Sequence, residues 1–462
     1  MNMEEMRMRC SFTVITQFRV HQTAANSMSV EGISNMLESC LTFEPGFYEF
    51  RDSQLFDDEE QSVYILGRKF TGKKDLAEVK KYVSSLLWFT YRKNFAPIGG
   101  TGPTSDQGWG CMLRCAQMLM AHSLTVRHLG RSWQWSVDNA KNDNYVRILK
   151  MFQDRKDCLY SLHQIAQCGV DDKRKVGDWF GPNTAAQVLK KLTVFNQWSG
   201  MSVHVALDTL WVHNDVRMMA YTKPPAMISH NIDEKKNDCE FETMRRKSSK
   251  RSAKKSIESD MEEKWRPLLI IVPLRLGLRE INRCYISAFQ ELFKIPQFSG
   301  ILGGRPNHAL YIVGMVGERI IYLDPHFCQQ SVNVDKQPVG EDDFEAVDGT
   351  DNAKELENEE STSDDSTFHC SYMLHANYSS LDPSLALAFT CLDEADYNDL
   401  CDRLQKDVLK EHPSLFHFID KRPKDFPKFV PYNGLGEGFE YKEFFDLGDP
   451  HCNSDEEFEL LE

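Results

Sequence analysis

The sequence predicts an α/β fold, with helices and strands mixed in the α+β manner around one large core. Segments with apolar residues at helical spacing alternate along the chain with short apolar runs that are typical of buried strands. The chain has 462 residues, of which 41% are hydrophobic, and a chain of this size can bury one sizeable core. We therefore expect one main domain with additional segments around it.

Each expected element rests on the spacing of its apolar residues. Helical spacing predicts helices over 76–92, 111–124 and 184–192. Continuous apolar runs predict buried strands at 63–66, 268–274, 309–316 and 319–323. The glycine-rich stretch 99–104 interrupts regular structure shortly before the helix that begins at Cys111.

Composition divides the chain into an N-terminal arm at 1–62, a main domain at 63–440 and an acidic tail at 441–462. Within the main domain, the stretches 233–264 and 335–367 are rich in charged residues and serine. Such segments cannot bury enough apolar surface to offset the entropy lost on ordering, so we expect both to be disordered insertions. The basic run at 245–251 fits a solvated loop better than a phosphorylation or nuclear-targeting signal.

Charge and cysteine content exclude several classes of protein. The formal net charge is −15, whereas proteins that bind nucleic acid or anionic lipid need a basic surface. The longest apolar runs are far shorter than the roughly 20 residues of a membrane span, and the first residues lack the pattern of a secretory signal. The thirteen cysteines are odd in number and widely spread. They are typical of reduced thiols, so we expect a cytoplasmic protein.

Cys111 stands at the start of a predicted helix, directly after Gly110. Free backbone N–H groups and the helix dipole favour a thiolate at that position, which suits a nucleophile. The alternative is that Cys111 is a small buried hydrophobic residue, which is the usual state of a free cysteine.

Asp324 and His326 follow the predicted strand 319–323 and are two positions apart. Alternate residues of a strand face the same side, so the carboxylate can lie beside the imidazole and fix its tautomer. Taken alone, the pair also fits a surface turn.

Several longer blocks stand out along the chain: WFTYRKNF at 88–95, IGGTGPTSDQGWGCMLR at 98–114, GDWFGPN at 177–183, PLRLG at 273–277, GILGGRPN at 300–307 and YLDPH at 322–326. Together these blocks resemble the autophagin family, the papain-like cysteine proteases of autophagy. The resemblance runs in order from about residue 63 to 404, resumes at the tail and skips both insertions. The resemblance implies a papain-like fold with a small accessory subdomain.

The resemblance also implies roles for individual residues. It makes Cys111 the nucleophile, His326 the general base and acid, and Asp324 the carboxylate that orients His326. Tyr91 matches the family tyrosine that helps to stabilise the oxyanion; without the family it would be interpreted as a core tyrosine.

Substrate access is the next implied feature. Trp179 matches a tryptophan that covers the catalytic cysteine, although without the family it would be assigned to the core. The block 300–307, with Gly303, Gly304 and Pro306, matches a flexible loop that closes over the site. Together they leave a slot that admits glycine and little else, which suits a ubiquitin-like C-terminal tail.

The implied substrates are GABARAP-type ubiquitin-like modifiers, both as precursors and as conjugates with phosphatidylethanolamine. We expect a monomer that meets the membrane only through the lipidated substrate. In the tail, Phe458 and Leu461 follow acidic residues and resemble a short motif that binds such modifiers by adding to a sheet edge. A frayed terminus is the alternative interpretation of the tail.

Two further hypotheses concern thiols and metals. Cys115 lies one turn after Cys111, and Cys328 is two residues after His326, so a neighbouring thiol could make oxidation of Cys111 reversible. Cysteine and histidine residues lack paired metal-ligand spacing, so we expect no metal and no cofactor. Rival interpretations are a non-catalytic adaptor that binds the modifier through its tail, and a protease with an unrelated substrate.

Overall fold

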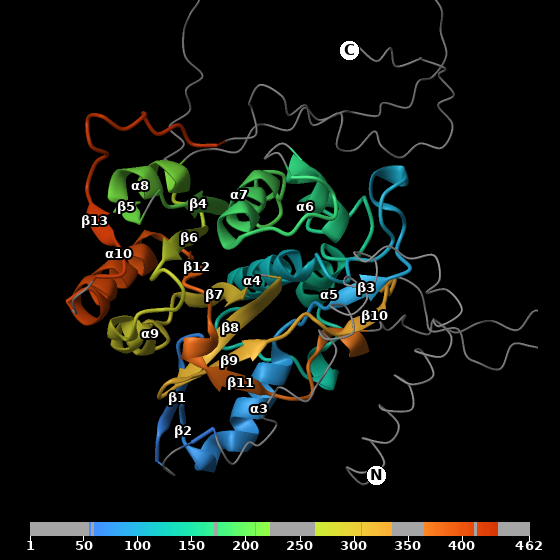
Figure 1. The fold of residues 1–462 in the computed structure, drawn as a ribbon, viewed down its shortest axis with the longest axis horizontal. Helices are drawn as coiled ribbons and strands as arrows, with labels where there is room; N and C mark the ends of the chain where they lie inside the picture. Colours follow the sequence, from blue (N-terminus) through green and yellow to red (C-terminus); the bar gives the residue numbers. More distant parts are fainter. Residues whose placement is uncertain are drawn as a thin grey trace, which may run out of the picture.

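A computed structural model describes residues 55–56, 60–170, 174–207, 209–221, 264–305, 307–334, 365–410 and 414–432 (Figure 1). Within these residues, a nine-stranded sheet forms the middle layer and helices cover both of its faces. No helix in these ranges is both long enough and apolar enough to span a lipid bilayer.

The central sheet is almost entirely antiparallel. Its strands run in the order β11 (Leu374–Asn377), β9 (Arg319–Leu323), β8 (His308–Val316), β7 (Phe298–Arg305), β12 (Ser384–Cys391), β6 (Leu268–Arg275) and β4 (Ser202–Val205). β1 (Ser62–Ile65) pairs with β8 and with β2 (Arg68–Thr71). Only β4 and β6 pair in parallel within this described sheet.

Two small parallel sheets lie outside the central one. β3 (Tyr91–Lys93) pairs with β10 (Cys328–Gln330), and β5 (Leu210–Val212) pairs with β13 (His417–Ile419). Short 3-10 turns lie at Lys73–Asp75, Ile98–Gly100, Val137–Asn139, Arg283–Tyr285, Ser366–Phe368 and Tyr378–Ser380. The pairing of β3 with β10 joins the chain before Cys111 to the chain after His326.

The helices form two layers because the strands are apolar on both faces. One core includes side chains of α3 (Leu76–Ser85), α4 (Cys111–His128), α5 (Asp143–Lys150), α6 (Leu162–Cys168) and α7 (Pro182–Thr193). The other includes α8 (His213–Tyr221), α9 (Ile286–Leu292) and α10 (Glu394–Arg403), which continues into a π-helical turn at Leu404–Val408. Along β6, Leu269 and Ile271 join the first core, whereas Leu268 and Ile270 join the second.

The α+β prediction is confirmed, since helices and a largely antiparallel sheet are mixed along the chain. The smaller layer of α8, α9 and α10 lies on the left of Figure 1. The expected accessory subdomain stays a prediction. The strands predicted at 63–66, 268–274, 309–316 and 319–323 are β1, β6, β8 and β9. The helices predicted at 111–124 and 184–192 lie within α4 and α7.

The predicted helix 76–92 is wrong beyond Ser85. α3 ends there, and Leu86 adopts an extended backbone with φ −75° and ψ 142°. The following residues are pulled into other contacts: the Trp88 backbone N–H donates to the Phe368 carbonyl at 2.8 Å, and Tyr91 begins β3. Periodicity could not show this break, because a continuously buried apolar run fits helix and strand alike.

The predicted arm, insertions and tail lie largely outside the described residues, so their boundaries remain predictions. At the arm's end, Leu55 and Phe56 are buried in the first core. At the end of the second insertion, Asp365 accepts hydrogen bonds from Trp135 at 2.8 Å and Tyr145 at 2.7 Å. Residues that composition assigned to the arm and to the second insertion therefore contact the main domain.

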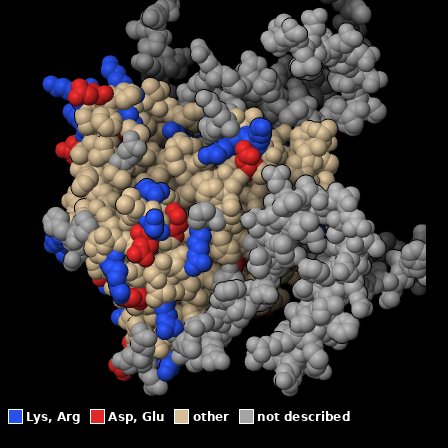
Figure 2. Space-filling view, viewed as in Figure 1, with Lys and Arg blue, Asp and Glu red and all other residues tan. Residues whose placement is uncertain are grey.

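One face of the described surface carries both signs of charge. Figure 2 shows Lys and Arg interspersed with Asp and Glu across the described atoms of one face. The prediction that the chain is not a nucleic-acid carrier rested on its net charge of −15 and stays a prediction.

Candidate active site

Cys111 is the first residue of α4, a helix whose residues are buried along most of its length. Gly110 precedes it as N-cap and offers no side chain to the first turn. The first N–H groups of a helix have no partner within the helix, and they carry its positive end. The Cys111 thiol is fully buried at this positive end.

Asp324 and His326 lie at the end of β9, as their spacing predicted. The Nδ1 atom of His326 is 2.5 Å from Oδ1 of Asp324, and the same oxygen accepts the His326 backbone N–H at 2.9 Å. The Trp88 indole donates to the Asp324 carbonyl at 2.7 Å, and the Tyr91 backbone N–H donates to the Pro325 carbonyl at 2.8 Å. Both side chains are buried, so this turn is fixed from several sides.

The electrostatics of the three residues favour a thiolate and an imidazolium. Burial lowers the pKa of His326, but the hydrogen bond and charge of Asp324, with a contribution from Cys111, outweigh it and raise that pKa to about 10. Burial also opposes ionisation of Cys111, yet His326 and the Ala309 backbone N–H make the net change in its pKa a lowering. The pKa of Asp324 is lowered too, because the His326 hydrogen bond and charge exceed the effect of burial.

The Nε2 atom of His326 is buried, and it meets no partner at full hydrogen-bond geometry among the described residues. Its side-chain interaction with Cys111 is nevertheless the largest of the effects that lower the pKa of that thiol, followed by the charge of His326. Such contacts are often loose before substrate binds, and Nε2 remains available to receive or deliver a proton.

Tyr91 lies beside this pair, at the start of β3. Its ring meets the His326 ring edge-on, with centroids 5.4 Å apart and an interplanar angle of 87°. Burial, followed by the charge of Cys111, raises the pKa of Tyr91, so the phenol stays protonated. Its buried hydroxyl meets no acceptor at full hydrogen-bond geometry among the described residues, but a side-chain interaction with Cys111 helps to raise the pKa of Tyr91 and to lower that of Cys111.

Comparison with known proteins identifies the family of the chain. Residues 76–403 match the model of the peptidase C54 catalytic domain. The chain belongs to the autophagin family of cysteine proteases. Curated relatives include Cysteine protease ATG4A of Bos taurus, 43% identical over 81% of this chain and 86% of the relative, and that of Homo sapiens, 41% identical over the same shares. Cysteine protease ATG4B of Gallus gallus is 37% identical over 91% of this chain and 98% of the relative.

In this autophagin structure, Trp179 is the first of the predicted gating residues. Trp179 is half-buried between α6 and α7 and packs against the first core, and its indole nitrogen has no described partner. No hydrogen bond or ring contact joins it to Cys111 among the described residues, so its role as a cover of that cysteine remains a prediction.

The expected flexible loop at 300–307 is mostly strand. Gly303 and Gly304 belong to β7 and pair with Leu310 and Ala309 of β8, while Pro306 lies outside the described residues. Backbone pairing on both edges of β7 overrides the loop expected from its glycines. Gly304 has φ +124°, and a Cβ there would lie 2.2 Å from the His308 carbonyl oxygen. The tight end of this hairpin therefore requires glycine.

The structure weakens the redox hypothesis for Cys115. That thiol is fully buried, and burial, aided by the charges of Cys111 and Asp324, raises its pKa well above the usual value. A protonated thiol is a poor attacking group, which opposes a resolving role. Burial also raises the pKa of half-buried Cys328. The tail residues Phe458 and Leu461 lie outside the described part of the chain.

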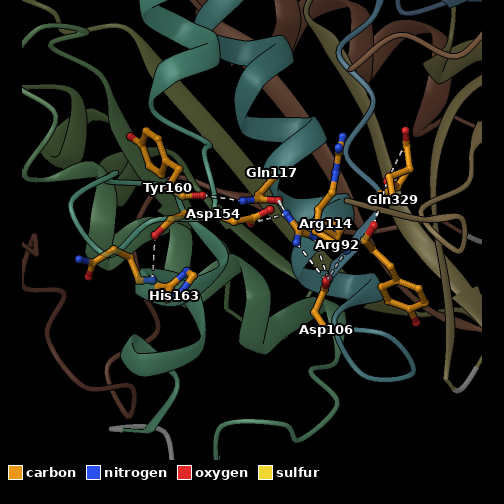
Figure 3. Close-up of polar contacts among 12 residues, drawn as sticks. Arg92, Asp106, Arg114, Gln117, Asp154, Tyr160, His163 and Gln329 are labelled. Atoms are coloured by element: carbon orange, nitrogen blue, oxygen red, sulfur yellow. Dashed lines mark hydrogen bonds and ion pairs between the residues drawn. The ribbon is translucent and has the colours of Figure 1, made fainter. Parts of the chain in front are cut away.

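A buried ionic network supports the start of α4 (Figure 3). Arg114 donates to Asp106 through Nε at 2.8 Å and through Nη2 at 3.0 Å, and to Asp154 through Nη1 at 2.8 Å. Asp106 also accepts the Arg92 backbone N–H at 2.7 Å. Gln117 extends the network by donating to the Tyr160 carbonyl at 2.7 Å.

This network connects the chain segments that carry Tyr91 and Cys111. The Asp106 carboxylate contacts β3 through the backbone N–H of Arg92, the residue after Tyr91, and it contacts α4 through Arg114. The backbone carbonyl of Asp106 accepts the Gly110 N–H at 2.8 Å, and a Cβ on Gly110 would lie 2.3 Å from the Asp106 carboxylate. The glycine before Cys111 is therefore required by packing against Asp106.

Sequence reasoning missed three residues of this region. Asp106 and Arg114 stood inside a block used only for the resemblance, although a charged residue within the apolar run 111–124 signals a buried ion pair. His308 stacks on His326, and no feature of the sequence pattern indicated this contact.

His308, Asp324 and His326 are the described group whose ligand atoms could together hold a metal, lying within 4.8 Å of one another. Their geometry suits a proton-transfer site better. The Asp324 and His326 atoms that face each other already share a hydrogen bond. The two imidazole rings are nearly parallel, so their nitrogen lone pairs do not converge on one point.

We predict that Asp106→Asn lowers the free energy of unfolding by about 3–5 kcal/mol, because it leaves the buried Arg114 guanidinium undercompensated. Urea denaturation measures the change. The matched control is Asp157→Asn, which removes an exposed carboxylate that pairs with Arg155 and should cost less than about 1 kcal/mol. Equal, small effects at both positions would contradict a structural role for the network.

Proposed function

We propose that this chain cleaves GABARAP-type ubiquitin-like modifier precursors after a C-terminal glycine, and that it also releases the modifier from phosphatidylethanolamine. The observation that carries the proposal is the buried set of Cys111, His326 and Asp324, in which a thiol with a lowered pKa lies near an imidazole held by a carboxylate. Membership of the autophagin family supports the choice of substrate.

The proposed reaction begins with attack of the Cys111 thiolate on the carbonyl carbon of the substrate glycine. The Tyr91 hydroxyl and the Cys111 backbone N–H donate to the developing oxyanion. The imidazolium of His326 protonates the departing amine, which belongs to a peptide or to phosphatidylethanolamine. The C–N bond breaks and a thioester with Cys111 remains.

Hydrolysis completes the proposed cycle. Neutral His326 removes a proton from a water molecule, which attacks the thioester and returns Cys111 to the thiolate while His326 regains its charge. Asp324 keeps Nδ1 protonated and directs Nε2 toward the reacting atoms throughout. No metal or cofactor is required by these steps.

The proposed setting is the cytoplasm, where the enzyme acts as a monomer and meets membranes only through the lipidated modifier. Trp179, Gly303, Gly304 and Pro306 would line the entrance for a glycine-ended tail. The same amide chemistry serves both substrates, because in each the leaving group is an amine attached to the modifier's last glycine.

The test is cleavage of a GABARAP-type precursor that carries a reporter after its glycine. We expect Cys111→Ala to lower the rate by at least about 10³-fold and Asp324→Asn to lower kcat by on the order of 10⁴-fold. Cys115→Ala, a buried cysteine on the same helix, is the matched control and should retain activity.

Other outcomes would redirect the proposal. A wild-type chain that binds the modifier without cleaving it would favour the adaptor interpretation. Equal cleavage of short peptides that end in glycine would contradict specificity for a folded modifier. Hydrolysis of the modifier from phosphatidylethanolamine vesicles, lost in Cys111→Ala, would extend the result to the conjugate.

We further predict that Phe458→Ala and Leu461→Ala each weaken modifier binding by about tenfold, because each removes a side chain that would fill an apolar pocket. Leu460→Ala, between them in sequence, is the control and should change the affinity little. Isothermal titration calorimetry with the Cys111→Ala chain measures binding without turnover. Unchanged affinity in both variants would exclude the tail motif as a docking element.

A further inference from the structure

We propose that His308 is a positioning residue for His326, holding the plane of the imidazole that faces Cys111. This inference rests on the proposed catalytic role of His326. It assigns a function to a residue that belongs neither to the catalytic set nor to the expected gate.

The two rings are stacked closely. Their centroids are 3.9 Å apart, and the angle between their planes is 7°. His326 is 3% exposed, whereas His308 is only partly buried, so the His308 ring covers one flat face of His326 on the more open side. The Tyr91 ring meets His326 edge-on at 87°, and Asp324 holds Nδ1. The hydrogen bond to Asp324 lies in the plane of the His326 ring and restrains tilting of that plane only weakly. Stacking against His308 supplies this missing restraint.

The backbone fixes His308 in that position. His308 is the first residue of β8 and pairs with Arg305 at the closed end of the β7–β8 hairpin. Gly304 approaches the His308 carbonyl where no Cβ would fit, and the Gly304 carbonyl accepts the Asp382 N–H at 2.6 Å. The next residue, Ala309, contributes the backbone N–H that lowers the pKa of Cys111. One short stretch of β8 thus faces both the imidazole and the thiol.

Of the two stacked rings, only that of His326 carries a positive charge near pH 7. Burial, followed by the charge of His326, lowers the pKa of His308 to about 4, whereas Asp324 acts in the opposite direction and Arg305 adds to the lowering. His308 is therefore neutral near pH 7 and presents an aromatic face to the His326 imidazolium. An aromatic face within about 6 Å of a cation stabilises it. Loss of that face should destabilise the imidazolium and, with it, the Cys111 thiolate.

The experiment compares aromatic and non-aromatic replacements in the full chain. His308→Phe keeps a flat ring, whereas His308→Gln and His308→Leu remove it at similar size. The pH midpoint of Cys111 ionisation is read from the ultraviolet absorbance of the thiolate, after subtraction of the Cys111→Ala titration. The kcat for the reporter-bearing precursor is measured in parallel, and thermal unfolding midpoints check that each variant is folded.

We expect both non-aromatic variants to raise the thiolate midpoint by about half to one pH unit and to lower kcat at neutral pH by about threefold to tenfold. His308→Phe should stay within about twofold of wild type on both readouts. A thiolate midpoint unchanged in folded Gln and Leu variants, or a Phe variant as impaired as they are, would overturn the positioning role alone. A wild-type midpoint near the ordinary thiol value of about 8.5 would overturn the proposed ion pair as well.

Discussion

The hydrogen bond between Asp324 and His326 is the contact on which the rest of the site depends. Both groups are almost fully buried, and a buried charge is costly unless another charge lies beside it. The carboxylate stabilises the charged form of the buried His326 ring, and that imidazolium in turn stabilises the buried Cys111 thiolate. Removing one member would leave the others as uncompensated charges, so the three ionise as a set.

This set requires three segments that are distant in sequence to meet at one site. The end of β9 carries Asp324 and His326, the start of α4 carries Cys111, and β3 carries Tyr91. The β3–β10 pairing joins the first and third segments, and the Asp106–Arg114 network joins the second and third. Packing of α4 against β7 and β8 then places the Cys111 thiol near the end of the sheet where the site lies. Buried polar contacts, rather than apolar packing alone, define the site.

Local pattern predicted the elements well where the period was clear. The helix that begins at Cys111 and the strand before Asp324 follow from spacing, and so does the shared side of Asp324 and His326. Spacing could not place Cys111 near His326, because that depends on strand order and on which helix crosses the sheet. Only the family resemblance connected the two.

The misses have physical reasons. The run beyond Ser85 is buried on all sides, which removes the periodicity that separates helix from strand. The glycines at 303 and 304 belong to a strand, because backbone pairing and close packing decide their conformation. The stack of His308 on His326 joins two strand ends through tertiary structure, which no local pattern encodes.

The most direct test of the account is the protonation state of His326 in the resting enzyme. Nitrogen-15 NMR of histidine-labelled protein, with the signal assigned by His326→Gln, reports both ring nitrogens as pH is raised. The account predicts an imidazolium that persists well above the ordinary histidine pKa of about 6.5 and loses its proton near pH 10. Titration of His326 near the ordinary value, with Cys111 still a thiol, would contradict the ion pair on which the proposed chemistry rests.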